Sequence, residues 1–439
     1  MIFRSFMCRI QLVFGTIIIL GGTILIYQLY LTHCENDLEY TGTGIPIILW
    51  WTPFGTSGSI KQCSERCYFT QDRSFHRHRD LKAILFYGSN FRVDDLPDWK
   101  SSRIPWGLIH EESPRNNPIL VHEDALSLFN YSATFSRFSD VPLTLIDLPS
   151  TEDLTGKKYF KTTKEKTELM EKHNLAPLLY IQSDCNTASD RDLYVKELMQ
   201  YIKVDSYGSC LNNAKLKHNL KDNYLESLGS DEFLSFVSSY KFTIAFENAV
   251  CDDYITEKLW RPLIVGSVPI YYGSPSFKDW LPTNKSAISV LDFSSPQQLS
   301  AFLHYLLSNE TAYEEYLTHK LFPQAQVTNE RLLESLKNSP KGTINDFGHY
   351  VDQFECFVCD NLPNGDFDKG RIVEKKEYNC PIPVNPISRK QDATNWWTEQ
   401  WLVENCGAKL LNYYIRNNIS VSEHSFERIR YNMYERSEC

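Results

Sequence analysis

Side chains that could carry chemistry follow apolar runs at three places in the 439-residue sequence. The densest place is FENAVCDDYITEKLW, in which Glu247 and Asn248 close a predicted strand and Glu257 and Lys258 begin a predicted helix. A lysine beside the free N–H groups of a helix terminus can hold phosphate, and a carboxylate can accept hydrogen bonds from ribose hydroxyls. The segment therefore indicates a nucleotide site, although an exposed helix face can carry the same Glu–Lys pair.

Arg191 is a second candidate for binding phosphate. It follows the apolar run 178–182 after a loop that contains Ser183 and Asp184. From that position a guanidinium could reach a diphosphate from the side opposite Lys258. An exposed arginine in the first turn of a helix is the alternative, because most arginines are solvated.

Two adjacent carboxylates form the third candidate. Glu111 and Glu112 follow the apolar run WGLIH in the sequence HEESP. Crowding of two carboxylates raises the pKa of one of them toward neutral pH, as a general base requires. Because Ser-Pro favours turns, an ordinary surface turn is the alternative.

Metal-binding patterns are weak. The segments 190–192 and 366–368 read Asp-x-Asp, a pattern that can chelate a divalent ion under a nucleotide diphosphate. That use needs the motif at the end of an apolar strand, whereas polar residues precede both copies. We therefore expect no metal site.

The N-terminus indicates the compartment. Residues 10–32 form an uncharged run of 23 residues, more than the ~20 that span a bilayer. Arg4 and Arg9 precede it, which favours a cytosolic N-terminus and an uncleaved signal anchor, with a cleaved leader as the alternative. Both place the rest of the chain in the secretory lumen. Four sequons could then carry glycans: Asn130, Asn284, Asn309 and Asn418.

The lumen also bears on the 12 cysteines. Four of them could form a zinc site in a reducing compartment, but an oxidising lumen favours two disulfides. These four are Cys63, Cys67, Cys356 and Cys359.

The composition predicts a folded α/β protein. Apolar residues make up 42% and charged residues 23%, and the net charge of -10 argues against nucleic acid as a partner. Apolar runs at 45–51, 83–88 and 106–111, and a second series from residue 175, predict two blocks of parallel strands. In such sheets ligands bind at the carboxyl ends of the strands, so the candidate residues would face a cleft between the blocks.

The predicted elements of the second block bracket its candidate residues. We expect strands at 240–248, 267–273 and 286–293 and helices at 254–264 and 297–307, with Ser189 and Asp192 resembling a capping box. The predicted organisation is a cytosolic tail (1–9), a transmembrane anchor (10–32), a stem (33–44), an N-terminal domain with its linker (45–174), a second domain (175–353) and a Cys-rich extension (354–439).

The sequence resembles the α-1,3-fucosyltransferase family over roughly residues 45–360. FENAVCDDYITEKLWRPLIVGSVPIYYGSPS is similar to the donor-binding signature of that family, and HEESP and FNYSATFSRFSD are similar to its N-terminal segments. HEESP, SDCN, FECFVC and the Cys-rich tail most resemble the branch numbered ten and eleven, which is linked to protein O-fucosylation. The resemblance implies two facing Rossmann-like domains of the GT-B type, GDP-β-L-fucose as the donor, inversion at the anomeric carbon and no metal in the chemical step.

The resemblance also implies roles for individual residues. Glu112 matches the proposed catalytic base, with Glu111 as a second candidate. Cys63 is expected to pair with Cys356, and Cys67 with Cys359. Donor-binding positions are carried over to Ser183, Asp184, Arg191, Tyr207, Asn248, Tyr254, Glu257 and Lys258. Asp184 replaces an asparagine that is common in members acting on glycans, and Cys185 beside it is a further departure.

We therefore expect an inverting fucosyltransferase with a glycoprotein acceptor, in a single-pass type II protein of the endoplasmic reticulum or Golgi membrane. The acceptor hydroxyl could belong to a protein Ser or Thr, or to GlcNAc of a glycan. A metal-dependent transferase would need an Asp-x-Asp at a strand end. A lumenal binding or chaperone-like protein that keeps the fold without turnover is the other alternative.

Overall fold

The computed structural model describes residues 44–97, 104–148, 150–216, 228–321, 326–339, 347–362 and 371–439. The predicted cytosolic tail, the transmembrane anchor at 10–32 and nearly all of the stem lie outside these residues. Within them, no helix combines the length and the apolar character needed to cross a bilayer.

The first sheet is formed by six strands of the described chain in the order β2-β3-β1-β4-β5-β6. All neighbouring strands are parallel except β2 and β3. The strands are β1 (Ile47–Trp50), β2 (Ser59–Gln62), β3 (Arg66–Thr70), β4 (Leu81–Tyr87), β5 (Trp106–His110) and β6 (Tyr131–Thr134). Strands β1 and β5 are buried along their whole length, as expected for a parallel sheet covered on both faces.

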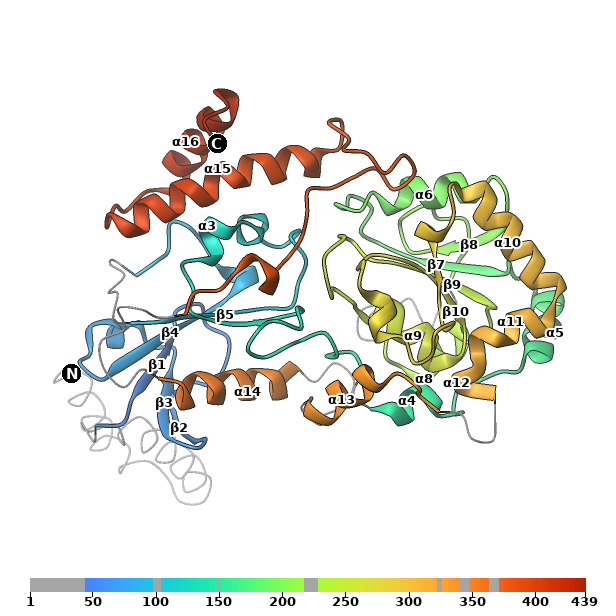
Figure 1. The fold of residues 1–439 in the computed structure, drawn as a ribbon, viewed down its shortest axis with the longest axis horizontal. Helices are drawn as coiled ribbons and strands as arrows, with labels where there is room; N and C mark the ends of the chain where they lie inside the picture. Colours follow the sequence, from blue (N-terminus) through green and yellow to red (C-terminus); the bar gives the residue numbers. More distant parts are fainter. Residues whose placement is uncertain are drawn as a thin grey trace, which may run out of the picture.

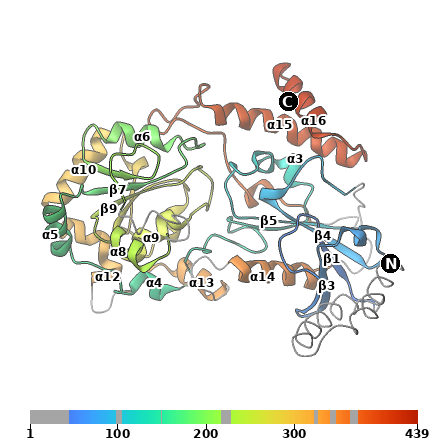
Figure 2. The ribbon, with the colours of Figure 1, turned by 180° about the vertical axis from the view of Figure 1, so that it is seen from behind.

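Helices from the C-terminal part of the chain cover both faces of this first sheet. The face of the sheet that carries Trp50 packs against α14 (Phe347–Asp360). The opposite face, which carries Phe86, packs against α15 (Trp396–Arg416) and also against the short helix α3 (Glu123–Leu126). Figures 1 and 2 show α14 and α15 on opposite sides of the sheet. Helix α14 spans the boundary predicted at 353/354, so the chain returns to the first domain before that boundary.

The second sheet is parallel throughout, in the order β11-β10-β9-β7-β8. Its described strands are β7 (Leu178–Ile181), β8 (Val204–Tyr207), β9 (Phe242–Phe246), β10 (Val268–Tyr272) and β11 (Ile288–Ser289). These strands match the apolar runs of the second block, except that the run 286–293 forms only two strand residues before a 3-10 turn.

Helices cover both faces of the second sheet as well. One face packs against α6 (Arg191–Leu198) and α10 (Pro296–Ser308), and the other against α8 (Asp231–Val237) and α9 (Glu257–Val265). In Figures 1 and 2, α9 lies on the side of this domain that faces the first. Further helices of the described chain are α4 (Thr151–Thr155), α5 (Thr163–His173), α11 (Glu310–Glu314), α12 (Thr318–Leu321), α13 (Glu330–Asn338) and α16 (Glu423–Glu435).

Two predicted helix starts are corrected by the structure. Helix α9 begins at Glu257 rather than at residue 254, because the side chain of Thr256 accepts a hydrogen bond from the Lys258 N–H and caps the helix. Ser189 does not form the expected capping box. Its hydroxyl donates to the Glu247 carbonyl at 2.6 Å, and Asp190, with φ 48°, precedes α6 instead.

Five disulfides tie distant parts of the described chain together. The pairs Cys63–Cys356 and Cys67–Cys359 are those that the resemblance implied, and they fasten α14 to the β2–β3 region. The sequence did not indicate the partners of the other cysteines, which form Cys185–Cys210, Cys251–Cys380 and Cys406–Cys439.

Candidate functional site

The candidate residues lie just beyond the carboxyl ends of three strands. Glu111 and Glu112 follow β5 of the first sheet, Ser183 and Asp184 follow β7 of the second, and Glu247 and Asn248 follow β9. The ends of parallel strands are the usual ligand-binding edge of an open α/β sheet.

Glu111 and Glu112 are neighbours in sequence, but their side chains have different surroundings. Glu111 Oε1 accepts a hydrogen bond from the Tyr87 hydroxyl at 2.7 Å, whereas its Oε2 is buried and has no partner among the described residues. Burial raises the pKa of Glu111 to about 7. Its hydrogen-bond partner belongs to β4 of the first sheet itself.

Glu112 instead interacts with residues of the second domain. Burial raises its pKa, and the positive charge of Lys258 partly offsets this effect by lowering it. The negative charge of Glu257 raises the pKa further. These interactions require proximity, so the structure brings Glu112 close to the start of α9, as the sequence predicted.

Lys258 is held at the N-terminus of α9 by a short network. Its Nζ donates to Thr256 Oγ1 at 3.0 Å and to Glu257 Oε1 at 3.2 Å, and lies 3.6 Å from Glu247 Oε2. Burial lowers the pKa of this amine, but Glu257 and Glu247 outweigh burial and raise it. Lys258 therefore keeps its positive charge at the N-terminus of α9, where the helix dipole also favours an anion.

Glu247 is a site residue to which the sequence assigned no function of its own. It is fully buried, and its two oxygens accept from the Thr256 N–H at 2.9 Å and the Thr256 hydroxyl at 2.8 Å. The carboxylate thus fixes the turn that leads into α9. Gly273 is required opposite it, because a Cβ there would lie 2.5 Å from Glu247 Cγ.

A further carboxyl, Asp147 of the segment between the two sheets, also faces this network. Burial and the negative charge of Glu257 raise the pKa of Asp147. For Glu257, burial is outweighed by Lys258 and Arg261, whose charges lower its pKa. The negative charge of the pair therefore resides mainly on Glu257.

Arg191 is buried at the first position of α6, with 1% of its surface exposed. Its two Nη atoms donate to the carbonyls of Phe246 at 3.1 Å and Asp184 at 2.8 Å, and its Nε has no partner among the described residues. Its charge is close enough to Lys258 to lower the pKa of that amine in part. The structure thus brings Arg191 and Lys258 together, but buries the guanidinium more deeply than the sequence predicted.

The loop after β7 contacts the first domain. Asp184 Oδ1 forms an ion pair with Arg115 at 2.9 Å, and Ser183 beside it is exposed. Across the loop, Asn248 Oδ1 is buried without a partner among the described residues. These polar groups from both domains line the same region, and Asn248 retains a free acceptor there.

The two tyrosines assigned to donor binding are both buried. The Tyr207 hydroxyl lies 2.9 Å from that of Tyr240, and its ring packs against Phe236, so Tyr207 belongs to the hydrophobic core. Tyr254 is 3% exposed and packs against Phe135 of the first domain, near the charge of Glu112. The sequence position at a strand end or loop could not show which way these rings turn.

The C-terminal extension contributes residues that the sequence did not assign to the site. The Tyr378 hydroxyl donates to the Glu112 carbonyl at 2.7 Å, and the Tyr378 ring packs against His110 and Phe135. Two residues later, Cys380 is joined to Cys251, which directly follows the FENAV segment. The extension therefore fastens the proposed base to the donor segment.

One group of the described chain has metal-compatible spacing, namely Cys185, Asp192 and Cys210. The two sulfurs are joined in a disulfide, and Asp192 Oδ1 accepts from the Tyr180 hydroxyl at 2.5 Å. This set offers no thiolate to a metal ion.

Asn130 is a poor glycan acceptor in the folded chain. It is 7% exposed, and its amide accepts from the Trp106 N–H and donates to the Arg371 carbonyl. The sequon at this position is therefore structural, because a glycan needs an exposed side chain. Asn284 and Asn418 are exposed, and Asn309 is half-buried at the start of α11.

Comparison with known proteins gives two family matches. Residues 169–360 match "Glycosyltransferase family 10 (fucosyltransferase) C-term", and residues 44–145 match "Fucosyltransferase, N-terminal". The chain is 42% identical over 400 residues to "GDP-fucose protein O-fucosyltransferase 3" of Rattus norvegicus, covering 87% of this chain and 81% of the relative. It is 38% identical over 425 residues to "Alpha-(1,3)-fucosyltransferase B" of Drosophila melanogaster, covering 94% and 93%.

Among solved structures, the chain is similar to an α1,3-fucosyltransferase determined with GDP. The TM-score is 0.44 at 18% identity, and the alignment covers 75% of this chain and 94% of that one.

Proposed function

Because the chain belongs to glycosyltransferase family 10, the fucosyltransferases, and is a GDP-fucose-dependent fucosyltransferase, we propose that its acceptor is a serine or threonine hydroxyl of a protein. The rat relative that is 42% identical over 400 residues is named a protein O-fucosyltransferase, and the match extends over 81% of that relative. The observation that carries the mechanism is the proximity of Glu112, from the first domain, to Lys258, from the second.

In the proposed reaction, Glu112 removes the proton of the acceptor hydroxyl while that oxygen bonds to the anomeric carbon of fucose. The bond from this carbon to the β-phosphate oxygen breaks, and GDP leaves with the electron pair. Attack from the face opposite GDP converts the β-linked donor into an α-linked product. The proton ends on Glu112, whose pKa is raised by burial, as suits a general base.

Charged groups of the second domain stabilise the leaving diphosphate. Lys258 supplies a fixed positive charge at the N-terminus of α9, and Arg191 adds a second charge nearby. Because these groups are held by Glu247, Thr256 and backbone carbonyls, they need little reorganisation when charge develops on the diphosphate. Glu257 and Asn248 offer acceptors for the hydroxyls of the nucleotide and sugar.

We also propose that the two sheets form facing Rossmann-like domains of the GT-B type, with the donor bound to the second. The charge-free run 10–32 supports anchoring by one helix, with the catalytic part in the lumen of the endoplasmic reticulum or Golgi.

The acceptor is tested by offering alkyne-tagged GDP-fucose to the full-length enzyme with two acceptors in parallel. One is the protein secreted by cells that lack the enzyme, and the other is a GlcNAc-terminated N-glycan. We expect the tag on serine or threonine, located by mass spectrometry and retained after enzymatic removal of N-glycans. Tag confined to the N-glycan would contradict a protein acceptor while leaving fucosyl transfer intact.

A further inference from the structure

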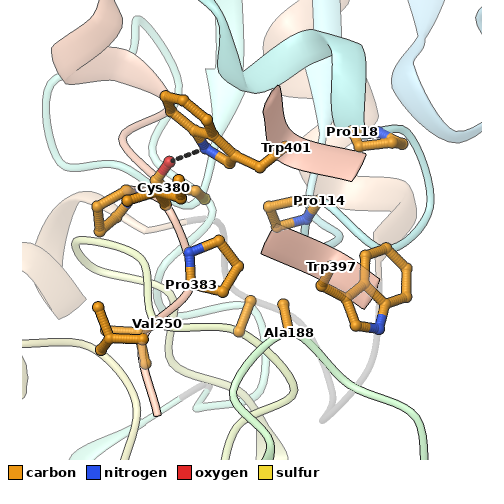
Figure 3. A pocket seen from close by; sticks show the side chains of 12 residues that line it. Pro114, Pro118, Ala188, Val250, Cys380, Pro383, Trp397 and Trp401 are labelled. Atoms are coloured by element: carbon orange, nitrogen blue, oxygen red, sulfur yellow. Dashed lines mark hydrogen bonds between the residues drawn. The ribbon is translucent and has the colours of Figure 1, made fainter. Parts of the chain in front are cut away.

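An apolar pocket lies where the two domains and the C-terminal extension meet. It encloses about 230 Å³, and Figure 3 shows side chains from all three parts around it. Pro114 and Pro118 come from the first domain, Ala188 and Val250 from the second, and Trp397 and Trp401 from α15.

The pocket is adjacent to the proposed base. Pro114 is two residues after Glu112, so their Cα atoms are no more than about 7 Å apart. Cys380, another lining residue, is two residues after Tyr378, whose hydroxyl donates to the Glu112 carbonyl. Ala249, a third wall residue, directly follows Asn248 of the donor segment. An acceptor with its hydroxyl at Glu112 would therefore extend over this pocket.

The lining suits an apolar side chain rather than a sugar. The two indole N–H groups are already used, because Trp401 donates to the Cys380 carbonyl at 3.2 Å and Trp397 to Asn186 Oδ1 at 3.0 Å. The other lining side chains are prolines, aliphatic residues and a disulfide-bonded cysteine. Sugar hydroxyls buried there would lose hydrogen bonds with water without replacement by these side chains.

The volume fits one large side chain. A dry cavity of about 150 Å³ holds a benzene ring, so 230 Å³ accommodates a phenylalanine, leucine or isoleucine side chain. Outside the pocket, Trp396 is 51% exposed and meets Trp397 edge to face at 4.7 Å, which continues the apolar surface. Exposed tryptophans of this kind are frequent anchors of protein interfaces.

Much of the pocket wall is formed by residues outside the segments that match the fucosyltransferase family. The segment from Cys380 to Val384 and helix α15 follow residue 360, where the fucosyltransferase match ends. The extension therefore forms part of the pocket wall in addition to covering the first sheet.

We propose that this pocket is a subsite of the enzyme for the acceptor polypeptide, holding one aromatic or branched aliphatic side chain two or three residues from the fucosylated serine or threonine. The spacing follows from the advance of about 3.3–3.6 Å per residue in an extended chain. This inference rests on the proposed protein acceptor and specifies what the site recognises in it.

The first test uses the modified sites mapped in the secreted proteins. We expect these sites to share a large apolar residue at a fixed offset of two or three positions from the modified hydroxyl. Sites with no such residue would overturn the subsite while leaving the protein acceptor intact. Label on the N-glycan alone would instead contradict the proposed acceptor, and the subsite with it.

The second test fills the pocket in the full-length enzyme. Ile382→Trp, and independently Val384→Trp, should raise KM for the best mapped acceptor roughly ten- to a hundredfold, the range expected from losing the burial of one large side chain. GDP affinity should stay the same, since none of the residues assigned to donor binding lines the pocket. Ile372→Trp is the matched control, because Ile372 is 49% exposed on the same extension and does not line the pocket.

The decisive comparison combines a substitution in the enzyme with a substitution in the acceptor and asks whether their effects on KM depend on each other. Replacing the shared apolar residue of the acceptor by serine should raise KM for the wild-type enzyme and for Ile372→Trp, but only slightly for a pocket-filled variant. Equal losses in all three enzymes would overturn the proposal. So would an unchanged KM in both pocket-filled variants, or an equal loss of transfer to the N-glycan, which would place a sugar in the pocket.

Discussion

At the scale of single residues, two adjacent glutamates at the end of β5 are distinguished by their partners. Glu111 accepts a hydrogen bond from Tyr87 of the first sheet. The pKa of Glu112 is instead shifted by the charges of Lys258 and Glu257 across the domain boundary. A base must face the sugar donor, so the geometry favours Glu112. The sequence left both carboxylates open, because neighbouring residues at a strand end can turn to opposite sides.

Replacing Glu112 should therefore separate chemistry from binding. Glu112→Gln keeps the side-chain shape but cannot accept the proton, so kcat should fall about 10²- to 10⁴-fold. The affinity for GDP, measured by calorimetry, should change little. Glu111→Gln is the matched control and should lower kcat less than tenfold. A larger loss in Glu111→Gln than in Glu112→Gln would reverse the assignment.

The pH dependence of kcat follows from the ionisation of Glu112. A base acts only when ionised, so kcat should fall with decreasing pH through a pKa above the ordinary value of 4.5, since burial raises the pKa of Glu112. The charge of Lys258 stabilises the carboxylate and lowers that pKa. In Lys258→Met the acidic limb should consequently move to higher pH, measured as kcat at saturating GDP-fucose. A limb that stays in place or moves down would contradict this electrostatic coupling.

At the scale of elements, the apolar runs predicted β1, β4 and β5 of the first sheet and the strands of the second sheet, but not β2, β3 or β6. Strands β5 and β9 were both visible in the sequence, because parallel strands buried on both faces are continuous apolar runs. Strand β9 ends at Phe246, two residues before the predicted end at 248. The sequence did not show where α9 begins, because the helical pattern starts at Tyr254, whereas the Thr256 cap sets the first helical residue at Glu257. The pairing of Cys251 with Cys380 was also hidden, since cysteine spacing alone does not define connectivity.

The end of α9 offers a test at this scale. Gly266 has φ 74°, and a Cβ there would lie 2.4 Å from the Phe160 ring. Gly266→Ala should lower the free energy of unfolding by more than about 1–2 kcal/mol, the cost of the left-handed conformation before any clash. Gly229→Ala is the control, because no atom lies within 4 Å of its Cβ position. Equal melting temperatures for the two variants would refute this strain.

At the scale of the whole molecule, the site exists only because separate parts are fixed to one another. The extension reaches the donor segment through Cys251–Cys380, and Asn379 beside it donates to Asp252 at 2.6 Å. No pattern in the sequence predicts these contacts, because they join residues more than 100 positions apart whose side chains are common in surface loops. The site residues and their position between the two blocks were therefore expected from the sequence, whereas the contacts of the C-terminal extension with them were not.

Arg137 of the first domain and Asp253 of the second form the contact that tests this dependence. The arginine donates from Nε and Nη2 to the two Asp253 oxygens at 2.8 and 2.5 Å, and Asp253 is 1% exposed. Burial would raise the pKa of Asp253, but Arg137 keeps it lowered. Arg137→Met leaves this buried charge without its main partner, so the free energy of unfolding should fall by about 3–5 kcal/mol.

The same change should lower kcat, because the domain boundary across which Lys258 acts on Glu112 loosens, whereas GDP binding within the second domain should be largely retained. Adding Asp253→Asn to Arg137→Met removes the unpaired charge and should recover part of the stability in chemical denaturation. It should not recover kcat, since the link between the domains stays broken. An Arg137→Met variant with wild-type kcat would mean that the two domains keep their alignment without this pair.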